Sequence, residues 1–291
     1  SFDVESLYTN VPIEESLKII KQKLQLDDTL IERSKLPVGG IMELLECCIK
    51  TTYFQEDDKF YAQKEGLPMG SPLSPVIANI YMEFFENLTI KTSAIKPKAW
   101  LRYVDDTFII WSHDTESLKQ FLNHINSTRP TIKFTMEKEK ENKLAFLDVE
   151  VTRLNNSLET SVYRKPTHTG QYLHFNSNHT QATKIGLIKN LINRAKNLCS
   201  TTAQLDREVE NITKDLTSNG YPMKLIRKIL DKQGETTATK EEQTTLTGLT
   251  IPYEQGISEK IRRIARPLGV RTVFSSRNTL RSQLTKTKPK Q

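Results

Sequence analysis

The sequence predicts an α+β fold in two parts: an antiparallel sheet with helices in residues 1–160, and a mainly helical domain in residues 161–291. Strand-like alternating segments are interleaved with apolar helical segments in the first part, whereas helical periodicity dominates the second. Charge also changes at this boundary. Residues 1–160 carry 19 Lys and Arg against 25 Asp and Glu, a net of −6, and residues 161–291 carry 23 against 10, a net of +13.

In the first part, apolar periodicity and start signals such as Pro12 predict four helices. They cover residues 13–24, 38–51, 76–88 and 114–127. Strands are predicted where apolar and aromatic residues alternate. They cover the opening "SFDV", a hairpin in "TYFQEDDKFYAQ", a second hairpin in "AWLRYVDDTFIIW" with acids at its tip, and residues 131–139 and 143–153.

In the second part, one helical face gathers apolar side chains at Ile185, Ile188, Leu191, Ile192, Ala195 and Leu198. Helices are predicted over residues 183–199, 204–220, 222–232 and 258–269. We expect Asn219-Gly220 to end the second of these and Ser258 to cap the last. Residues 233–250, rich in Thr and Glu, are expected to form a solvated loop.

Charge, hydropathy and cysteine content narrow the class of protein. A basic part beside a mildly acidic one suggests a polyanion as partner, with arbitrary surface charge as the alternative. No apolar run reaches the ~20 residues of a membrane helix, so no membrane association is expected. Three cysteines are too few, and odd in number, for a disulfide scaffold. This usage favours a reducing, intracellular setting.

Asp3, Asp105 and Asp106 are candidate metal ligands. In phosphoryl transfer, two divalent ions ~3.5–4 Å apart stabilise charge on the attacking and leaving oxygens. Mg²⁺ prefers carboxylate oxygen, so such a site needs aspartates from separate strands. Adjacent strand residues point to opposite faces, and we expect Asp105 to face Asp3 with Asp106 to the side. Ordinary turn chemistry is the alternative for an isolated Asp-Asp pair.

The loop "GLPMGSPLSP" and a nearby tyrosine are candidate substrate contacts. Glycines let a backbone approach a nucleotide closely, and the hydroxyls of Ser71 and Ser74 can donate to sugar or phosphate. The ring of Tyr8, five residues after Asp3, would clash with a 2′-hydroxyl and so favour deoxynucleotides. An ordinary loop and a packed aromatic ring are the alternatives. The candidate substrate-binding residues are Tyr8, Gly66, Pro68, Met69, Gly70 and Ser71.

Four phrases, in order, resemble motifs A, B, C and E of reverse transcriptases. They are "SFDVESLYTNVP", "GLPMGSPLSPVIANIYMEFFE", "RYVDDTFIIW" and "LAFLDVEV". The wording is most similar to the reverse transcriptases of Penelope-like retroelements. The phrases "VYRKPTHTGQYLHFNSNHT", "IPYEQGISEKIRRIARPLGVRTVF" and "NTLRSQL" extend the resemblance over nearly the whole chain. Motifs B and C with these later phrases are specific, whereas motif A alone is not.

The resemblance implies a right-hand polymerase with a palm in residues 1–160 and a thumb with a C-terminal extension in residues 161–291. It implies an RNA-directed DNA polymerase of a retrotransposon, acting with two Mg²⁺ or alternatively Mn²⁺ ions. Its partners would be an RNA template, a DNA primer and deoxynucleoside triphosphates, in the nucleus of a eukaryotic host. The implied roles are catalysis by Asp3, Asp105 and Asp106, a sugar gate at Tyr8, and a primer grip at Phe146, Leu147 and Asp148.

Two departures from the family pattern concern modules outside the motifs. The fingers that precede motif A are absent, so we expect this chain alone to be inactive. A GIY-YIG endonuclease, common in such elements, would lie beyond Gln291, and no nuclease activity is expected here. A lysine could protonate the leaving pyrophosphate, and Lys138, Lys140 and Lys143 are candidates beside a plain solvated charge run.

The basic second part is expected to hold a duplex through phosphate contacts that do not read sequence. The candidates are Lys184, Lys189, Arg194, Lys196, Arg262, Arg263 and Arg266, with solubilising surface charge as the alternative. His168, His174 and His179 match no metal spacing and are expected to be surface or packing residues.

Three other functions compete with RNA-templated DNA synthesis. An RNA-making polymerase would share the acids, but Tyr8 argues against it. A catalytically inactive nucleic-acid-binding remnant would show decayed acids, and here all three aspartates and both loop glycines stand. A structural protein with chance motifs would not place them in order along the chain.

Overall fold

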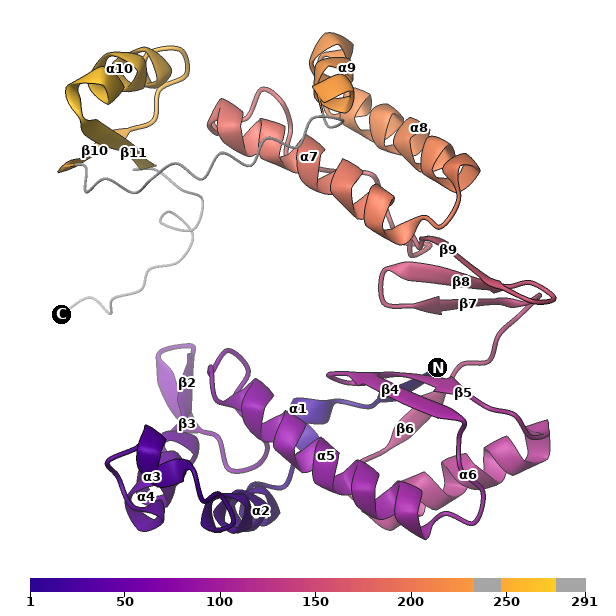
Figure 1. Ribbon diagram of the computed structural model, residues 1–291. Helices are drawn as coiled ribbons and strands as arrows, with labels where there is room; N and C mark the ends of the chain where they lie inside the picture. Colours follow the sequence, from indigo (N-terminus) through magenta and orange to yellow (C-terminus); the bar gives the residue numbers. More distant parts are fainter. Residues whose placement is uncertain (233–246, 276–291) are drawn as a thin grey trace. The chain divides into compact units, whose positions relative to one another are not determined.

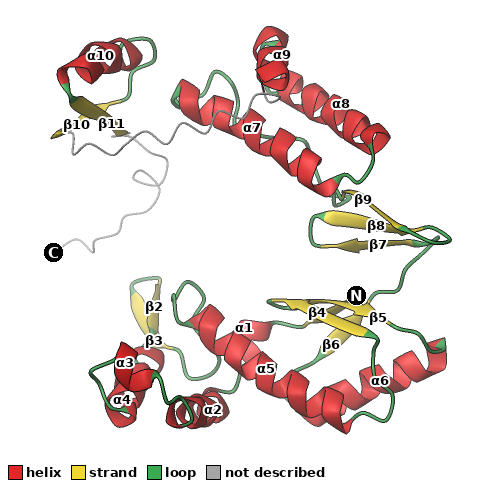
Figure 2. Cartoon of the chain, viewed as in Figure 1, coloured by secondary structure: helices red, strands yellow, loops and turns green. Residues whose placement is uncertain are grey.

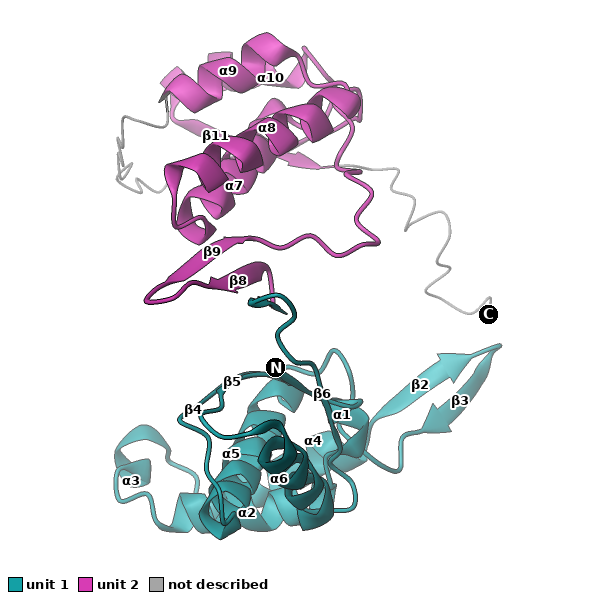
Figure 3. Ribbon diagram, turned by 90° about the vertical axis from the view of Figure 1, so that its right-hand side faces the viewer, with its two compact units in different colours: residues 1–146 teal, residues 147–291 magenta. Residues whose placement is uncertain are grey.

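The computed structural model of the 291-residue chain describes residues 1–232 and 247–275 (Figure 1). Two compact units follow one another in sequence, unit 1 over Ser1–Phe146 and unit 2 over Leu147–Gln291 (Figure 3). The division predicted at residue 160 thus falls inside unit 2. Among the described residues, we find no helix with the length and apolar character that crossing a bilayer requires.

Unit 1 is built on a four-stranded antiparallel sheet in the order β4-β5-β1-β6. Its strands are β1 (Phe2–Val4), β4 (Ala99–Tyr103), β5 (Asp106–Ile110) and β6 (Phe134–Met136). The first residues of the chain therefore pair with two strands that are remote in sequence. Phe2 and Val4 are buried in this central strand, while Asp3 between them is exposed on the other face. The predicted α+β class with an antiparallel sheet is confirmed.

The helices of unit 1 are α1 (Leu7–Asn10), α2 (Ile13–Gln25), α3 (Leu30–Arg33), α4 (Val38–Lys50), α5 (Ser74–Thr92) and α6 (Thr115–Thr128). Of these, α5 and α6 lie along the face of the sheet that carries Phe2, and α2 packs against α5 and α4 (Figure 2). The four predicted helices correspond to α2, α4, α5 and α6, whereas the single-turn helices α1 and α3 were not predicted. Aromatic rings join the layers, with centroids 6.3 Å apart for Phe2 and Phe121 and 5.8 Å apart for Phe85 and Phe134.

The first predicted hairpin is confirmed as β2 (Tyr53–Glu56) and β3 (Lys59–Ala62). Its two-residue turn holds Asp57 and Asp58 at φ of 47° and 61°, a left-handed conformation that aspartate tolerates better than most residues. All eight strand residues are exposed. The polar centre of the segment therefore signalled the turn correctly.

Unit 2 begins with an antiparallel hairpin and continues with three packed helices. Strand β7 (Lys143–Phe146) ends unit 1, and unit 2 holds β8 (Val149–Arg153), β9 (Leu158–Val162), α7 (Gln181–Leu198), α8 (Thr202–Ser218) and α9 (Met223–Lys232). Ile188, Ile192 and Ala195 of α7 are buried against residues of α8 and α9, as the apolar periodicity predicted. Gly220, at φ 81°, follows Asn219 at the end of α8, so the predicted stop signal is confirmed.

The last described segment is a small β-α-β unit, of which the sequence predicted the helix but not the two strands. It comprises β10 (Thr247–Pro252), α10 (Ser258–Ala265), the 3-10 turn η1 (Arg266–Leu268) and β11 (Val270–Ser275). The two strands run parallel. The loop prediction is wrong for residues 247–250, and its remainder, residues 233–246, lies outside the described residues, as does "NTLRSQL". Ser258 does not cap α10, because its hydroxyl instead accepts from the backbone N–H of Glu254 at 2.7 Å.

Candidate active site

The central strand pairing brings the first predicted aspartate beside the other two. Asp3 and Asp106 are direct partners in the antiparallel register of β1 and β5, and such partners share one face of the sheet. Asp105 lies in the preceding turn, and its carbonyl oxygen accepts from the N–H of Val4 at 3.2 Å. This register places Asp106, and not Asp105 as expected, directly opposite Asp3 on the same face.

The carboxylates repel one another in this arrangement. Burial raises the pKa of the Asp3 carboxyl, and the negative charges of Asp106, Asp105 and Glu5 raise that pKa further. Like charges gathered on one face of a sheet are unfavourable by themselves. A bound cation would relieve the repulsion, so the electrostatics of this corner suit a site for a positive ligand.

A buried ion pair holds the hairpin that carries the acids. The Arg102 side chain of β4 donates from Nε to Glu86 Oε1 of α5 at 2.6 Å, and only 8% and 15% of the two side chains are exposed. Arg102 also donates to the carbonyl of Val104 at 3.1 Å, and Val104 sits at φ 58° in the turn. Trp100 Nε1 adds a 2.7 Å hydrogen bond to the same Glu86 oxygen. This support was not predicted; of the two glutamates in "YMEFFENL", Glu83 pairs with Lys23 and Glu86 with Arg102.

Tyr8 lies in α1 directly after the first aspartate strand and is half-buried. Its carbonyl oxygen accepts from the N–H of Leu67 at 2.6 Å, which ties the predicted sugar gate to the glycine loop. A Cβ on Gly66 would lie only 2.5 Å from the carbonyl oxygen of Thr9, and Gly66 has φ 70°. The close approach that this glycine permits is therefore to α1 of the chain itself.

The rest of the loop leaves some groups open and engages others. Gly70 has φ 93° with nothing within 4 Å of a Cβ built there, and Met69 is 75% exposed. The backbone carbonyl of Pro68 accepts from the N–H of Ser71 at 3.3 Å and from the Ser74 hydroxyl at 2.6 Å. Ser74 is buried with its hydroxyl used in this way, so its expected donation to a nucleotide is wrong. Met69, Gly70 and Ser71 remain available to a substrate.

The predicted primer grip is a turn at the boundary of the two units. Leu147 has φ 53° and is 41% exposed. In unit 1, the ring of Phe146 meets that of Phe108 of β5 with centroids 5.4 Å apart. In unit 2, Asp148 forms an ion pair with Arg194 of α7 at 3.1 Å. Arg194 is thus engaged by a carboxylate, which weakens its expected role as a phosphate contact.

One predicted phosphate contact is wrong. Lys184 is fully buried, and its ammonium group lies 5.2 Å from the centroid of the Phe175 ring. No hydrogen-bond acceptor reaches its Nζ within the described part of the chain. A side chain held in the helical core cannot touch a duplex. Lys189 and Lys196, farther along α7, are exposed as expected.

The arginines of α10 and η1 are exposed, as the duplex hypothesis requires. Arg262, Arg263 and Arg266 all reach solvent. The Arg262 guanidinium lies 5.1 Å from the centroid of the Phe274 ring of β11, so part of its side chain is used in packing. These positions allow phosphate contacts.

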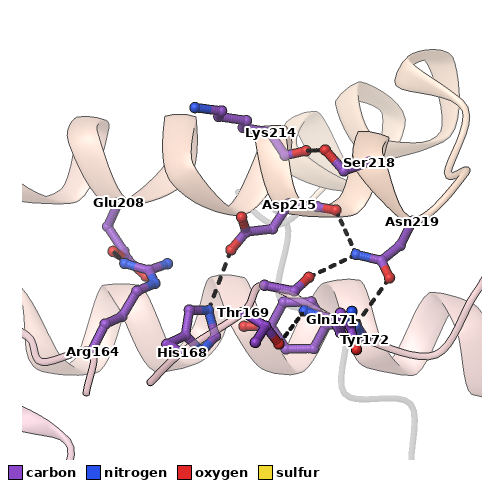
Figure 4. A network of polar contacts seen from close by, with 11 residues as sticks. Arg164, His168, Thr169, Gln171, Tyr172, Glu208, Lys214, Asp215, Ser218 and Asn219 are labelled. Atoms are coloured by element: carbon purple, nitrogen blue, oxygen red, sulfur yellow. Dashed lines mark hydrogen bonds and ion pairs between the residues drawn. The ribbon is translucent and has the colours of Figure 1, made fainter. Parts of the chain in front are cut away.

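The three histidines of the segment after β9 do not gather around a metal. His168 approaches Asp215 of α8, with Nε2 and Oδ2 3.6 Å apart, in a network that fixes this segment to α8 (Figure 4). Asn219 completes the network, since its amide donates to the carbonyl of Gly170 at 2.8 Å and accepts from the N–H of Tyr172 at 3.0 Å. The expected role of the histidines in surface and packing contacts fits this arrangement.

Within residues 1–232 and 247–275, no three His, Cys, Asp or Glu side chains form a closed metal centre. Mg²⁺ is commonly held by one or two protein carboxylates, with substrate phosphate and water completing its shell. The facing pair Asp3 and Asp106, with Asp105 beside it, offers oxygen ligands of this kind. The residues therefore fit Mg²⁺ or Mn²⁺ bound together with a nucleotide.

Comparison with known proteins adds two family matches. The family described as "Reverse transcriptase (RNA-dependent DNA polymerase)" matches residues 1–183, and the one described as "Animal helix-turn-helix domain" matches residues 171–231. The chain resembles solved structures of telomerase from Candida albicans (15% identity, TM-score 0.48) and Candida tropicalis (15%, 0.41), each in complex with a TWJ fragment of telomeric RNA. Each likeness covers 80% of this chain and only 38% of the telomerase chain. No curated protein sequence matches this chain.

Proposed function

This chain belongs to the reverse transcriptase family, and from that membership we propose that it synthesises DNA on an RNA template from deoxynucleoside triphosphates. The family match over residues 1–183 includes every residue of the candidate active site. The observation that carries the proposal is the pairing of Asp3 with Asp106 across two strands, with Asp105 in the adjoining turn. Two-metal nucleotidyl transfer requires such convergence of acids that are remote in sequence.

In this mechanism, Asp3, Asp105 and Asp106 would hold two Mg²⁺ ions, which Mn²⁺ could replace. When bound, these ions would supply charge stabilisation for the attacking 3′ oxygen and the departing pyrophosphate. Tyr8 forms the floor of the sugar site and excludes a 2′-hydroxyl. Its position is fixed because the N–H of Leu67 donates to its carbonyl.

The glycine loop and the primer grip orient the two reactants. Met69, Gly70 and Ser71 face the nucleotide, and Phe146, Leu147 and Asp148 hold the primer end. A protonated lysine among Lys138, Lys140 and Lys143 delivers a proton to pyrophosphate. Phosphates of the product duplex are contacted by the exposed cations Lys189, Lys196, Arg262, Arg263 and Arg266, in residues that we assign to a thumb.

We assign the chain to a retrotransposon of the Penelope-like type. The phrases of its second part, above all "VYRKPTHTGQYLHFNSNHT", support this subtype. Such an enzyme would act in the nucleus of a eukaryotic host, and a GIY-YIG endonuclease module would belong to the same element.

A primer-extension assay tests the proposal. The chain, and in parallel any longer natural protein that contains it, is given poly(rA)/oligo(dT), dTTP and Mg²⁺. We expect extension that Asp105→Asn abolishes, because a neutral amide is a poor Mg²⁺ ligand. The matched control Asp58→Asn removes a carboxylate from the exposed β2–β3 turn and should leave extension unchanged. If extension survives in Asp105→Asn, the metal assignment is refuted. If neither the wild-type chain nor the longer natural protein extends the primer, the result favours an inactive remnant.

The sugar gate has its own test. Tyr8→Ala should admit ribonucleotides, because the ring that would clash with the 2′-hydroxyl is gone. The measurement is the ratio of kcat/KM for dTTP and UTP, compared between wild type and variant. An unchanged ratio would show that Tyr8 is only a packing residue.

A further inference from the structure

The turn that carries Asp105 holds a residue in a strained conformation. Val104 and Asp105 form this two-residue turn between β4 and β5. Val104 has φ 58°, in the left-handed region. A residue branched at Cβ is an outlier there, and a hairpin turn with positive φ at its first position normally takes glycine. Such strain persists only where surrounding groups hold the residue in place.

Arg102 supplies this hold from the core side of the sheet. It pairs with Thr107 in the register of β4 and β5, and Thr107 pairs in turn with the buried Phe2. Cross-strand partners share a face, so Arg102 lies on the face opposite to Asp3. From there its Nη1 donates to the carbonyl of Val104 at 3.1 Å. Arg102 therefore holds the strained residue from behind the acids.

Arg102 is itself anchored to α5. Its Nε donates to Glu86 Oε1 at 2.6 Å, and its Nη2 donates to Glu86 Oε2 at 3.3 Å and to Asn79 Oδ1 at 3.1 Å. Trp100 Nε1 fixes the same carboxylate, since it donates to Glu86 Oε1 at 2.7 Å. The planar guanidinium can make all of these bonds at once, whereas a lysine ammonium on its flexible stem cannot. The side chain that holds the turn is thus itself held in place.

The central strand holds the turn at its other end. The N–H of Val4 donates to the carbonyl of Asp105 at 3.2 Å. The peptide groups before and after Asp105 are therefore both fixed, the first by Arg102 and the second by Val4. Because a peptide group is planar, fixing both of them sets the position of Asp105 relative to Asp3. Loss of the Arg102 bond would free the first peptide group to rotate and let Val104 leave the left-handed region.

We propose that Arg102 is a positioning residue for the metal site, because it holds the strained turn that places Asp105 beside Asp3. It lies on the opposite face of the sheet from the acids and acts through the backbone of the turn, not by touching a metal ion. The inference rests on the proposed function, since it takes the acids as metal ligands. Groups that orient metal ligands from behind typically contribute about 10–100-fold to metal affinity.

The first test is binding of Mn²⁺ alone to the full 291-residue chain, measured by EPR, with Asp3→Asn to identify the ions held by the acids. Arg102→Lys keeps a cation beside Glu86 but loses the bond to the turn. We expect it to weaken Mn²⁺ binding about ten-fold. In the Val104→Gly background the same replacement should weaken binding only about two-fold, because glycine takes φ 58° without strain.

Two controls separate positioning from stability. Arg129→Lys alters another arginine–glutamate pair of unit 1, with Nη2 2.9 Å from Glu15 Oε1, and should leave Mn²⁺ binding unchanged. Urea unfolding tests the strain itself. Val104→Gly should be more stable than Val104→Ala, the reverse of the usual order, because only glycine is unstrained at this φ. This comparison judges the strain even where Arg102→Lys fails to fold.

The proposal is overturned if folded Arg102→Lys binds Mn²⁺ as tightly as the wild type, or if its loss is equal in the two backgrounds. It is also overturned if Arg129→Lys loses as much affinity, or if Val104→Ala is as stable as Val104→Gly. Mn²⁺ binding that Asp3→Asn leaves unchanged would refute the metal site of the proposed function, and this inference would fall with it. Absent primer extension, with Mn²⁺ binding still dependent on Arg102, would count against the polymerase alone.

Discussion

Replacing Gly66 with alanine should lower the free energy of unfolding of unit 1 by about 2–5 kcal/mol. At φ 70°, a residue with a Cβ costs about 1–2 kcal/mol. The new methyl would also lie 2.5, 2.6 and 2.8 Å from the carbonyl oxygen, Cα and carbonyl carbon of Thr9. Backbone atoms cannot rotate away, so the loop must move off α1. That movement breaks the 2.6 Å hydrogen bond from Leu67 to Tyr8, which adds about 1–3 kcal/mol.

Gly70→Ala is the matched control. Gly70 has φ 93°, so alanine is strained there too, but nothing lies within 4 Å of the added methyl. We expect this variant to lose only the strain of about 1–2 kcal/mol. The difference between the two variants isolates the contact between the glycine loop and α1.

The assay is urea unfolding followed by tryptophan fluorescence. The chain has two tryptophans, Trp100 and Trp111, and both lie in unit 1. The signal therefore reports the unfolding of that unit without interference from unit 2. A lower midpoint at an unchanged slope measures the loss of stability. If Gly66→Ala costs no more than Gly70→Ala, the loop does not pack on α1 as described, and the support of Tyr8 by this loop falls with it.

Three further changes follow from the contacts of the two units. Glu86→Gln should destabilise unit 1 by about 3 kcal/mol in the same urea assay, because it leaves the buried Arg102 without its counter-charge; an unchanged midpoint would contradict the pair. Lys184→Met should raise the free energy of unfolding of unit 2 by about 1–3 kcal/mol, measured by calorimetry, because the buried ammonium beside Phe175 has no hydrogen-bond acceptor within the described residues. A lower stability of the variant would refute the reading of Lys184 as an unsatisfied buried charge. Asn219→Ala should lower the free energy of unfolding of unit 2 by about 1–3 kcal/mol in calorimetry, because it removes the amide that binds Gly170 and Tyr172. Asn219→Asp should lose less stability than Asn219→Ala, because it keeps an acceptor for the N–H of Tyr172 but loses the donor to Gly170.

Local patterns in the sequence predicted most of the elements but not the convergence of the acids. Apolar periodicity identified α2, α4, α5 and α6, and the acids flanked by apolar runs identified the β4–β5 hairpin. The pairing of Asp3 beside Asp106 followed from the resemblance and from what two-metal chemistry requires, not from strand patterns. A three-residue strand such as β1 carries too few side chains to specify its partner by itself.

Contacts between side chains that are far apart in the chain could not be predicted from the sequence. Glu86 and Arg102 lie in different elements, and nothing in either segment says that they meet. The parallel pair β10 and β11 was also missed, because "TGLTIP" is short and follows a Thr- and Glu-rich stretch that is typical of loops. Parallel pairing across a helix is decided by tertiary packing, which local propensity does not record.

The error at Lys184 has a different cause, because the sequence did contain its signal. Lys184 precedes Ile188 by four residues, and Ile192 follows four later, so all three belong to one stripe of α7. The prediction placed Lys184 on the surface because of its charge and did not take this stripe into account. An α-helix is rigid and residues four apart share a face, so a helix that buries Ile188 and Ile192 also brings Lys184 into the core, whatever its charge. Lys189 and Lys196 lie outside the stripe and are exposed. The same reasoning, applied to α9, places Lys224, Arg227 and Lys228 opposite Ile226 and Ile229, and the observed exposure agrees.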